Sequence, residues 1–380
     1  MSERAQRWAS TMTGHGDGPI RRAHVDAETK LGAVSAFGRI EREAVEDDVL
    51  APGATRAAGA GNRLRDEEPD EFRTCFERDR DRILHGTSAF RRLAGKTQVF
   101  VFPEDHQRTR LTHALEVAQV ATGIARACRL NVALTEAIAL GHDCGHGPFG
   151  HASEDAFTPY VHGGYDHAVW GADVVLAPLN LCQETSDGIR NHSWSRPAPS
   201  TPEGEVVAWA DRIAYVCHDF EDAVRAGIVT PEMLPEVVRS ACGDRRSRQL
   251  DAFISGVITT TLDQGEIGMH AHLAEALAAF RAFNYERIYM RPASVVQSEV
   301  VIKVLRALVE FFADRPNALP GPEIEGAGHP AEGASAGSEQ ALRDAVRYVA
   351  GMTDRFAFAQ ARAHLGWDPA GLPAGLDTGR

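Results

Sequence analysis

The sequence predicts an all-α fold, a helical bundle with at most one small β-hairpin. Mainly apolar residues recur at spacings of three and four, as in the stripe through Leu111, Leu115, Ala118, Thr122 and Ala125. This period places a stripe on one helix face, which can then pack against a core. Hydrophobic residues make up 43% of the 380 residues, enough for a substantial core, and β-like runs are few.

The expected elements start with a mobile N-terminal arm over residues 1–62, rich in Ala, Gly and charged residues, with one short helix around Ser35–Val49. The main domain spans residues 63–313. Within it, Gln98–Phe102 is the best candidate for a hairpin strand. Besides the stripe above, the helices expected in this domain are Asn131–Leu140, Pro202–Ala226, His272–Phe283 and Ser294–Phe312.

The C-terminal part begins with a segment of low complexity. Residues 314–340 are rich in Pro and Gly and lack an apolar period, which predicts a flexible linker or surface loop. Residues 341–380 follow, with one final helix over Asp344–His364 that we expect to pack on the main domain.

Charge and cysteine content narrow the class of protein. The formal net charge of −13 argues against a protein that coats nucleic acid with its whole surface. Between Arg73 and Arg129, however, eleven Lys/Arg accompany six Asp/Glu, a basic island that either attracts an anion or forms a solvated helix face. The six scattered cysteines indicate buried, reduced thiols in a cytoplasmic protein. We expect neither a signal peptide nor a membrane span.

Histidines gather in the middle of the chain, where residues 106–218 hold nine of the sixteen. The densest run is Gly141–His151, in which His142 and Asp143 are adjacent and several glycines turn the chain. A neutral imidazole beside a carboxylate offers two ligands to a divalent cation. The run therefore predicts part of a metal site.

Two further residues can complete that site. His113 lies on the preceding expected helix, and Asp211 lies in an apolar later one, where a carboxylate needs a partner. Taken singly, His113 is also explained as an ordinary core histidine and Asp211 as a surface carboxylate. Together with the His142–Asp143 pair they favour a metal site.

Longer blocks of this sequence resemble the HD superfamily, whose pattern is H…HD…D on a helical bundle. More narrowly they resemble bacterial deoxyguanosinetriphosphate triphosphohydrolases. The blocks are Phe76–Phe100, Gln107–Val117, Gly141–Glu154, Gly163–His167 and Gly351–Arg355. They extend from about residue 72 to residue 358, so the resemblance covers most of the chain.

The resemblance implies hydrolysis of a deoxynucleoside triphosphate (dNTP) to the deoxynucleoside and inorganic triphosphate. It implies the metal ligands His113, His142, Asp143 and Asp211. It also implies the catalytic residues His151, Glu154 and His146, and the substrate-binding residues Arg110, His167, Arg212, Tyr215 and Asp219. The cofactor is a divalent ion (Mn, Mg, Fe or Zn), and relatives of this kind form homo-oligomers.

Elementary chemistry is consistent with these roles. Spacings of four place Asp211, Tyr215 and Asp219 on one helix face. A triphosphate calls for nearby cations, for which Arg110, Arg212 and Lys96 are candidates. Glu154 is expected to stabilise the imidazolium of His151 as a general acid. Alternatively, Arg110 is a structural partner of the acidic pair Asp79 and Asp81.

The sequence departs from the family pattern at Ala168–Gly171, at Ser153 in FGHASE and at Val216–Cys217. These departures put the choice of substrate in doubt more than the chemistry. Two other functions therefore stay open. One is another HD reaction, a 5′-deoxynucleotidase or a phosphodiesterase. The other is a non-catalytic protein that binds nucleotides or single-stranded nucleic acid through the basic island and the N-terminal arm.

Overall fold

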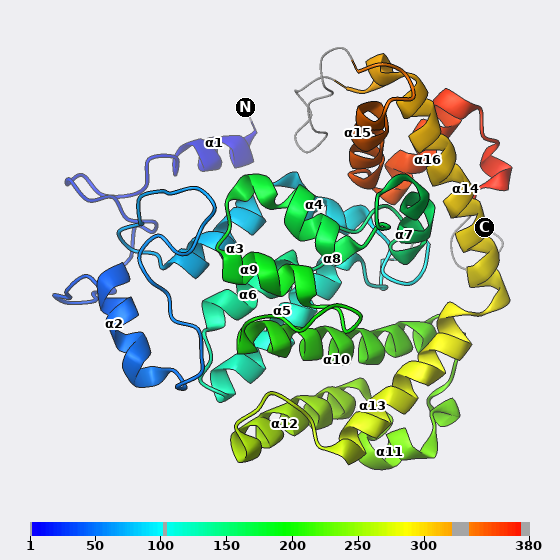
Figure 1. The fold of residues 1–380 in the computed structure, drawn as a ribbon. Helices are drawn as coiled ribbons and strands as arrows, with labels where there is room; N and C mark the ends of the chain where they lie inside the picture. Colours follow the sequence, from blue (N-terminus) through cyan, green and yellow to red (C-terminus); the bar gives the residue numbers. More distant parts are fainter. Residues whose placement is uncertain (1, 102–104, 321–333, 374–380) are drawn as a thin grey trace. The chain divides into compact units, whose positions relative to one another are not determined.

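The computed structural model describes residues 2–101, 105–320 and 334–373, and these residues form helices and connecting loops without a strand (Figure 1). The all-α prediction is confirmed. The α-helices are α1 (Glu3–Ala9), α2 (Arg39–Val49), α3 (Cys75–His85), α4 (Ser88–Arg92), α5 (Arg110–Ala127), α6 (Val132–Gly141), α7 (His151–Phe157), α8 (His167–Trp170), α9 (Gln183–Asn191), α10 (Pro202–Arg225), α11 (Glu236–Cys242), α12 (Arg246–Gln264), α13 (Ala271–Asn284), α14 (Pro292–Asp314), α15 (Glu339–Ala350) and α16 (Asp354–Leu365).

The chain forms two compact units, Met1–Phe37 and Gly38–Arg380. The first contains α1 and an isolated antiparallel bridge between His15 and Arg22. In the second, the segment after α2 is tied to α10, because the Thr55 amide and hydroxyl donate hydrogen bonds of 3.0 and 2.7 Å to the Glu203 carboxylate. The domain boundaries expected at residues 62, 313 and 340 stay predictions, and residues 321–333 of the expected linker lie outside the described residues.

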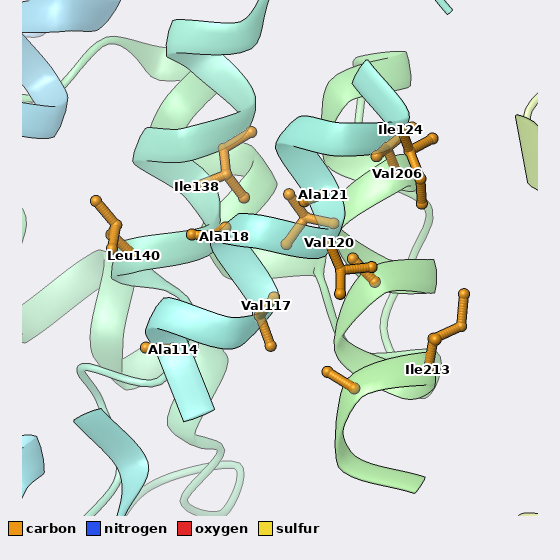
Figure 2. Close-up of a cluster of buried hydrophobic side chains, with 14 of the residues drawn as sticks. Ala114, Val117, Ala118, Val120, Ala121, Ile124, Ile138, Leu140, Val206 and Ile213 are labelled. Atoms are coloured by element: carbon orange, nitrogen blue, oxygen red, sulfur yellow. The ribbon is translucent and has the colours of Figure 1, made fainter. Parts of the chain in front are cut away.

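The hydrophobic core that positions the expected metal ligands forms where α5 packs between α6 and α10 (Figure 2). Alanines on α5 allow close approach of its neighbours, while branched residues fill the spaces between the helices. Burial of each branched side chain stabilises the fold by roughly 1.5–3 kcal/mol. The fully buried residues at this junction include Ala114, Val117, Ala121, Ile124, Ile138, Val206 and Ile213.

A second hydrophobic cluster lies where α14 packs against α7, α15 and α16. Its buried members include Leu305, Leu308 and Phe312 of α14 and Val349 of α15. This cluster places the C-terminal helices beside α7, the helix that begins with His151.

Two local predictions need correction. The single final helix is wrong, because α15 ends at Ala350 and α16 starts at Asp354. Thr353 caps α16, its hydroxyl accepting a 3.4 Å bond from the Phe356 amide, so a new helix begins there. The hairpin is also absent from the described residues. Near Gln98–Phe102 there is only an isolated bridge between Thr97 and Thr109, and Phe102 itself lies outside the described residues.

Neither a membrane span nor a disulfide occurs among the described residues. No described helix combines the length and apolarity that crossing a bilayer requires. All six cysteines are buried free thiols, as expected from their scattered positions.

Candidate metal centre

Three helices bring the expected metal ligands together. His113 lies one turn into α5, His142 and Asp143 directly follow α6, and Asp211 lies midway along α10. The Nε2 atom of His113 is 3.0 Å from Asp211 Oδ1. His142 Nε2 is 3.7 Å from the same oxygen and 3.5 Å from Asp143 Oδ1.

The chemistry of these donors fits a divalent cation. His142 is fully buried, and its Nδ1 is 2.7 Å from the Ala139 carbonyl, which assigns the ring proton to Nδ1. Its Nε2 therefore presents a lone pair, and among the described residues it has no hydrogen-bond partner. Atoms of His113, His142 and Asp211 lie within 4.8 Å of one another. A buried imidazole nitrogen without a partner is costly unless something binds there.

The two carboxylates of this set are held in their ionised form. Burial alone would raise the pKa of Asp211, but its hydrogen bond with His113 and the nearby histidines lower it. Burial also acts against ionisation of Asp143, and Arg110 is the main group that holds the pKa of Asp143 well below its usual range. Both are thus available as anionic ligands.

Arg110 lies beside the metal ligands and is 2% exposed. Its Nη1 donates a 2.8 Å hydrogen bond to Asp143 Oδ2, while Nε and Nη2 have no partner within the described structure. Gly150 makes room for this guanidinium: its φ is +60°, and a Cβ there would lie 2.3 Å from Arg110 Nη2. The unused N–H groups of Arg110 suit an anion.

The alternative prediction, that Arg110 is a structural partner of Asp79 and Asp81, is wrong. Asp79 pairs with Arg63 at 2.6 Å, and Asp81 pairs with Arg73 and Arg80 at 2.9 and 2.8 Å. These acidic groups therefore belong to other ion pairs.

Three further histidines cluster beside Asp143. The rings of His146 and His167 are stacked with centroids 3.7 Å apart, and the His151 ring is 5.1 Å from that of His146. His146 Nε2 lies 3.2 Å from Asp143 Oδ1. The turn that holds them needs glycine, because a Cβ on Gly145 would lie 1.9 Å from the His167 carbonyl oxygen.

Glu154 hydrogen-bonds to His167, and it acts on His151 through its charge. Its Oε1 accepts from the His167 amide at 2.9 Å and lies 2.5 Å from His167 Nδ1. Burial of the ring and then the Arg110 charge lower the pKa of His151 to about 4, and the Glu154 charge acts in the opposite direction. The His151 side chain still reaches solvent, so it lies at the mouth of the cluster.

Arg212, Tyr215 and Asp219, which were expected to contact the substrate, lie along α10. The side chains that contact Arg212 and Tyr215 within the protein were not foreseen. The Tyr215 hydroxyl accepts a 2.8 Å bond from Arg281, and the Arg212 guanidinium lies 3.7 Å from the centre of the Trp194 ring. No sequence pattern marked Arg281 or Trp194, because these contacts join distant segments.

One oxygen of the Asp219 carboxylate has a hydrogen-bond partner in the described structure and the other has none. Its Oδ2 accepts a 2.6 Å bond from the Tyr289 hydroxyl, whereas Oδ1 is buried without a partner in the described structure. Burial raises the pKa of Asp219 to about 7.

Lys96 is buried, and its ammonium group bonds to backbone carbonyls. Its Nζ donates to the carbonyls of His146 and Ala350, the latter at 3.0 Å, and burial followed by the Arg92 charge lowers its pKa to about 7. Its expected role in neutralising phosphate stays a prediction. It links the glycine-rich turn to the end of α15.

One buried histidine at the centre was not singled out from the sequence. His192 follows α9 and is 2% exposed, and its Nε2 is 3.2 Å from His167 Nε2. Its ligand atom also groups with those of His142 and Asp143. Its place within the histidine-rich span was the one available signal.

Comparison with known proteins agrees with this geometry. The HD domain profile matches residues 110–216, and the phosphohydrolase-associated domain profile matches residues 267–363. Curated relatives carry the name deoxyguanosinetriphosphate triphosphohydrolase-like protein. One from Caldanaerobacter subterraneus subsp. tengcongensis is 42% identical over 83% of this chain and 92% of its own length. The chain belongs to this family.

Other members of the family are similarly close. A relative from Desulfatibacillum aliphaticivorans is 39% identical over 83% of this chain and 94% of its own length. One from Clostridium perfringens is 39% identical over 77% of this chain and 87% of its own length. The protein is thus a hydrolase of the HD class, whose members are metal-dependent phosphohydrolases. The HD profile spans every expected metal ligand, from His113 to Asp211.

Proposed function

We propose that this protein hydrolyses deoxynucleoside triphosphates to the deoxynucleoside and inorganic triphosphate. The observation that carries the proposal is the convergence of His113, His142, Asp143 and Asp211 beside the buried, partly unpaired Arg110. A metal site beside a guanidinium with N–H groups free to donate is suited to binding a phosphate ester. The names of the relatives, deoxyguanosinetriphosphate triphosphohydrolase-like proteins, point to the same substrate class.

His113, His142, Asp143 and Asp211 would hold the divalent ion, which when bound supplies an activated water and positive charge for the α-phosphate. Arg110 binds a phosphate oxygen through Nε and Nη2, while its bond to Asp143 keeps the guanidinium in place. Because charge builds on phosphate oxygens as the P–O5′ bond breaks, this fixed donor is most useful in the transition state.

His151 is the proposed proton donor to the departing 5′-oxygen. It needs the imidazolium form for that step, whereas burial and then the Arg110 charge lower its pKa. A bound triphosphate carries about four negative charges at neutral pH and acts in the opposite direction, so substrate binding itself favours protonation of His151. Glu154 acts through His167 by fixing the orientation of that ring.

The sugar is expected to lie over the middle of α10. Tyr215 is partly buried there, and Asp219 Oδ1 is an acceptor without a partner in the described structure, suited to the 3′-hydroxyl. Tyr289 fixes the Asp219 carboxylate through the 2.6 Å hydrogen bond. An acceptor that is already oriented adds specificity for a substrate hydroxyl.

A single assay tests the proposal. Purified protein is incubated with Mn²⁺ and each of the four dNTPs, singly and in pairs, and the products are identified by mass. We expect deoxynucleoside and intact triphosphate. Orthophosphate or pyrophosphate as product would instead support another HD reaction and overturn the proposal.

The structure offers little for a nucleic-acid role of the basic island. Many of its arginines are paired with carboxylates of this chain: Arg73 with Asp70 and Asp81, Arg82 with Glu67, and Arg108 with Glu116, Glu221 and Asp222. Charges that are neutralised within the protein contribute little to binding a phosphate backbone. We therefore do not propose nucleic acid as the partner.

A further inference from the structure

Two of the six free thiols, those of Cys75 and Cys182, are hydrogen-bonded to each other. Both residues are buried, at 1% and 0% exposed. Gly61 lies against the two of them, because a Cβ on this glycine would lie 2.4 Å from Cys182 Sγ and 3.3 Å from Cys75 Sγ. The two sulfur atoms are therefore neighbours in the fold, although their residues are far apart in the sequence.

Hydrogen bonds already fix the backbone around this thiol pair. Asp79, one turn after Cys75 on α3, accepts from the Cys182 amide at 2.8 Å and from the Thr185 hydroxyl of α9 at 2.7 Å. Arg63 donates to the Asp79 carboxylate at 2.6 Å and to the Cys75 carbonyl at 3.0 Å. A bond between the two sulfurs would thus join elements that the fold already holds together.

The surroundings of the thiol pair favour a thiolate at Cys75. Cys75 is the first residue of α3 and Cys182 is the N-cap of α9, so both sulfurs belong to the positive ends of helices. The hydrogen bond from the Cys182 thiol is the main cause that lowers the pKa of Cys75, and the Arg63 charge assists it against burial and Asp79. The same hydrogen bond raises the pKa of Cys182. Cys75 is therefore the sulfur that loses its proton first.

The other four thiols lack this combination. Burial raises the pKa of Cys128, Cys144, Cys217 and Cys242. Cys242 lies near enough to Cys217 to raise the pKa of Cys217 further. Cys217 lies within α10, however, and Cys242 ends α11, where the negative end of the helix dipole disfavours a thiolate. Nearness of two thiols alone does not create a reactive pair.

A turn over residues 58–61 covers the thiol pair. The Ala58 amide donates a hydrogen bond to Cys75, and Gly61 contacts both cysteines, while Ala58 itself is exposed. The same short turn thus touches the sulfurs on one side and solvent on the other. Turns outside regular secondary structure open locally at a lower free-energy cost than core helices, which gives a small oxidant access to Cys75.

We propose that Cys75 and Cys182 form a site of reversible oxidation, at which hydrogen peroxide converts the two thiols to a disulfide. The Cys75 thiolate attacks one peroxide oxygen, the O–O bond breaks and hydroxide leaves, so that Cys75 becomes a sulfenic acid. The Cys182 sulfur then attacks the Cys75 sulfur, the S–O bond breaks, and the departing hydroxide takes the Cys182 proton. In total the thiols lose two hydrogen atoms and the peroxide is reduced to two waters. This inference is independent of the proposed function.

The test uses the full-length protein, treated with hydrogen peroxide and then with iodoacetamide to block the remaining thiols. We expect two of the six thiols to be lost at least about tenfold faster than the others, because the thiolate is the reacting form. A peptide map should show Cys75 joined to Cys182, and the mass of the chain should fall by about 2 Da. Dithiothreitol should restore all six thiols.

Three variants distinguish the roles of the two cysteines. Cys182→Ser removes the second thiol, so oxidation should stop at a sulfenic acid on Cys75, which dimedone traps. Cys75→Ser should leave Cys182 unreacted under the same conditions, because its pKa is raised. Cys242→Ser is the matched control, since it removes a buried cysteine at a helix C-terminus, and it should form the disulfide at the wild-type rate.

The other results count against the proposal. A disulfide between any other two cysteines, or a sulfenic acid that forms first on another cysteine, would assign the reactive thiol elsewhere. Retention of all six thiols at a peroxide concentration that fully oxidises free glutathione would show that the turn does not admit the oxidant.

A second measurement uses the wild type alone and does not depend on any variant folding. A disulfide restricts the unfolded chain, so the oxidised protein should melt at a temperature higher by at least about 3 °C, and dithiothreitol should remove this shift. An unchanged or lower melting temperature in the oxidised protein would contradict a disulfide that fits the native fold.

Discussion

Two buried polar clusters of this protein differ in how completely their atoms are bonded. Around Asp79, the carboxylate accepts from Arg63 at 2.6 Å, from the Cys182 amide at 2.8 Å and from the Thr185 hydroxyl at 2.7 Å. Around Asp143 and Asp211, by contrast, atoms of Arg110 and His142 lack partners within the described structure. A saturated cluster stabilises the fold, whereas an unsaturated one retains the capacity to bind a ligand.

The Asp211→Asn variant should show the largest effect, because the unsaturated cluster loses an anionic ligand. Activity should fall to background and bound metal should be lost, while the melting temperature stays nearly unchanged. Metal analysis and calorimetry on one preparation measure both. Asp173→Asn, a change in an exposed ion pair with Arg190, is the control. Full activity with unchanged metal content would show that Asp211 is not a ligand.

The saturated cluster should respond in the opposite way. Asp79→Ala removes the buried carboxylate that pairs with Arg63 and leaves that guanidinium with its ion pair to Glu67, which should lower the free energy of unfolding by about 3–5 kcal/mol. Metal content per folded molecule should not change. Asp70→Ala, in the exposed pair with Arg73, should cost under about 1 kcal/mol. Equal losses in the two variants, measured by urea denaturation, would contradict the comparison.

We predict that the free energy of unfolding depends on pH through the carboxyl group of Asp219. Its pKa is raised from 3.8 to about 7, so between these values the folded state holds a proton that the unfolded state releases. The contribution to the free energy of unfolding is therefore full below pH about 4 and is lost as the pH rises to about 7, by at most about 4 kcal/mol. Urea denaturation of metal-free wild type and Asp219→Asn should diverge over this range. Parallel pH profiles would show that Asp219 titrates normally.

Arg110→Lys should give the smallest effect. The variant keeps the charge but loses the planar fork, so activity should fall at least about tenfold with metal content and melting temperature nearly unchanged. A drop in melting temperature with an unchanged rate per folded molecule would instead give Arg110 a structural role. Arg110 would then stabilise the fold, as the groups around Asp79 do, and would not serve to bind a ligand.

The sequence predicted local features well. Helix periods are local, so the expected Asn131–Leu140 and Ser294–Phe312 correspond to α6 at Val132–Gly141 and α14 at Pro292–Asp314. The glycine-rich run predicted that His142 and Asp143 belong to one site, and the structure brings His113 and Asp211 to them.

Contacts between distant segments could not be predicted in this way. Lys96 was expected at phosphate, but its partner carbonyls belong to a turn and to a helix 254 residues away. Glu154 was expected to stabilise the His151 imidazolium, and its hydrogen bond to His167 across the turn was not foreseen. His192 had no motif of its own, because its significance depends on the neighbours that folding provides.

The hydrogen bonds of Asp354 limit how far the protein can be shortened without disturbing the site. Asp354, at the start of α16, accepts a 2.7 Å hydrogen bond from the Phe149 amide and a 2.8 Å bond from the Thr97 amide. The turn that carries His146 and His151 is thus held from the far end of the chain. A shortened protein that stops after residue 216, where the HD profile ends, would keep every expected metal ligand yet leave this turn unsupported. Small molecules selected for binding to such a shortened protein would fit an altered turn and not the site of the full chain.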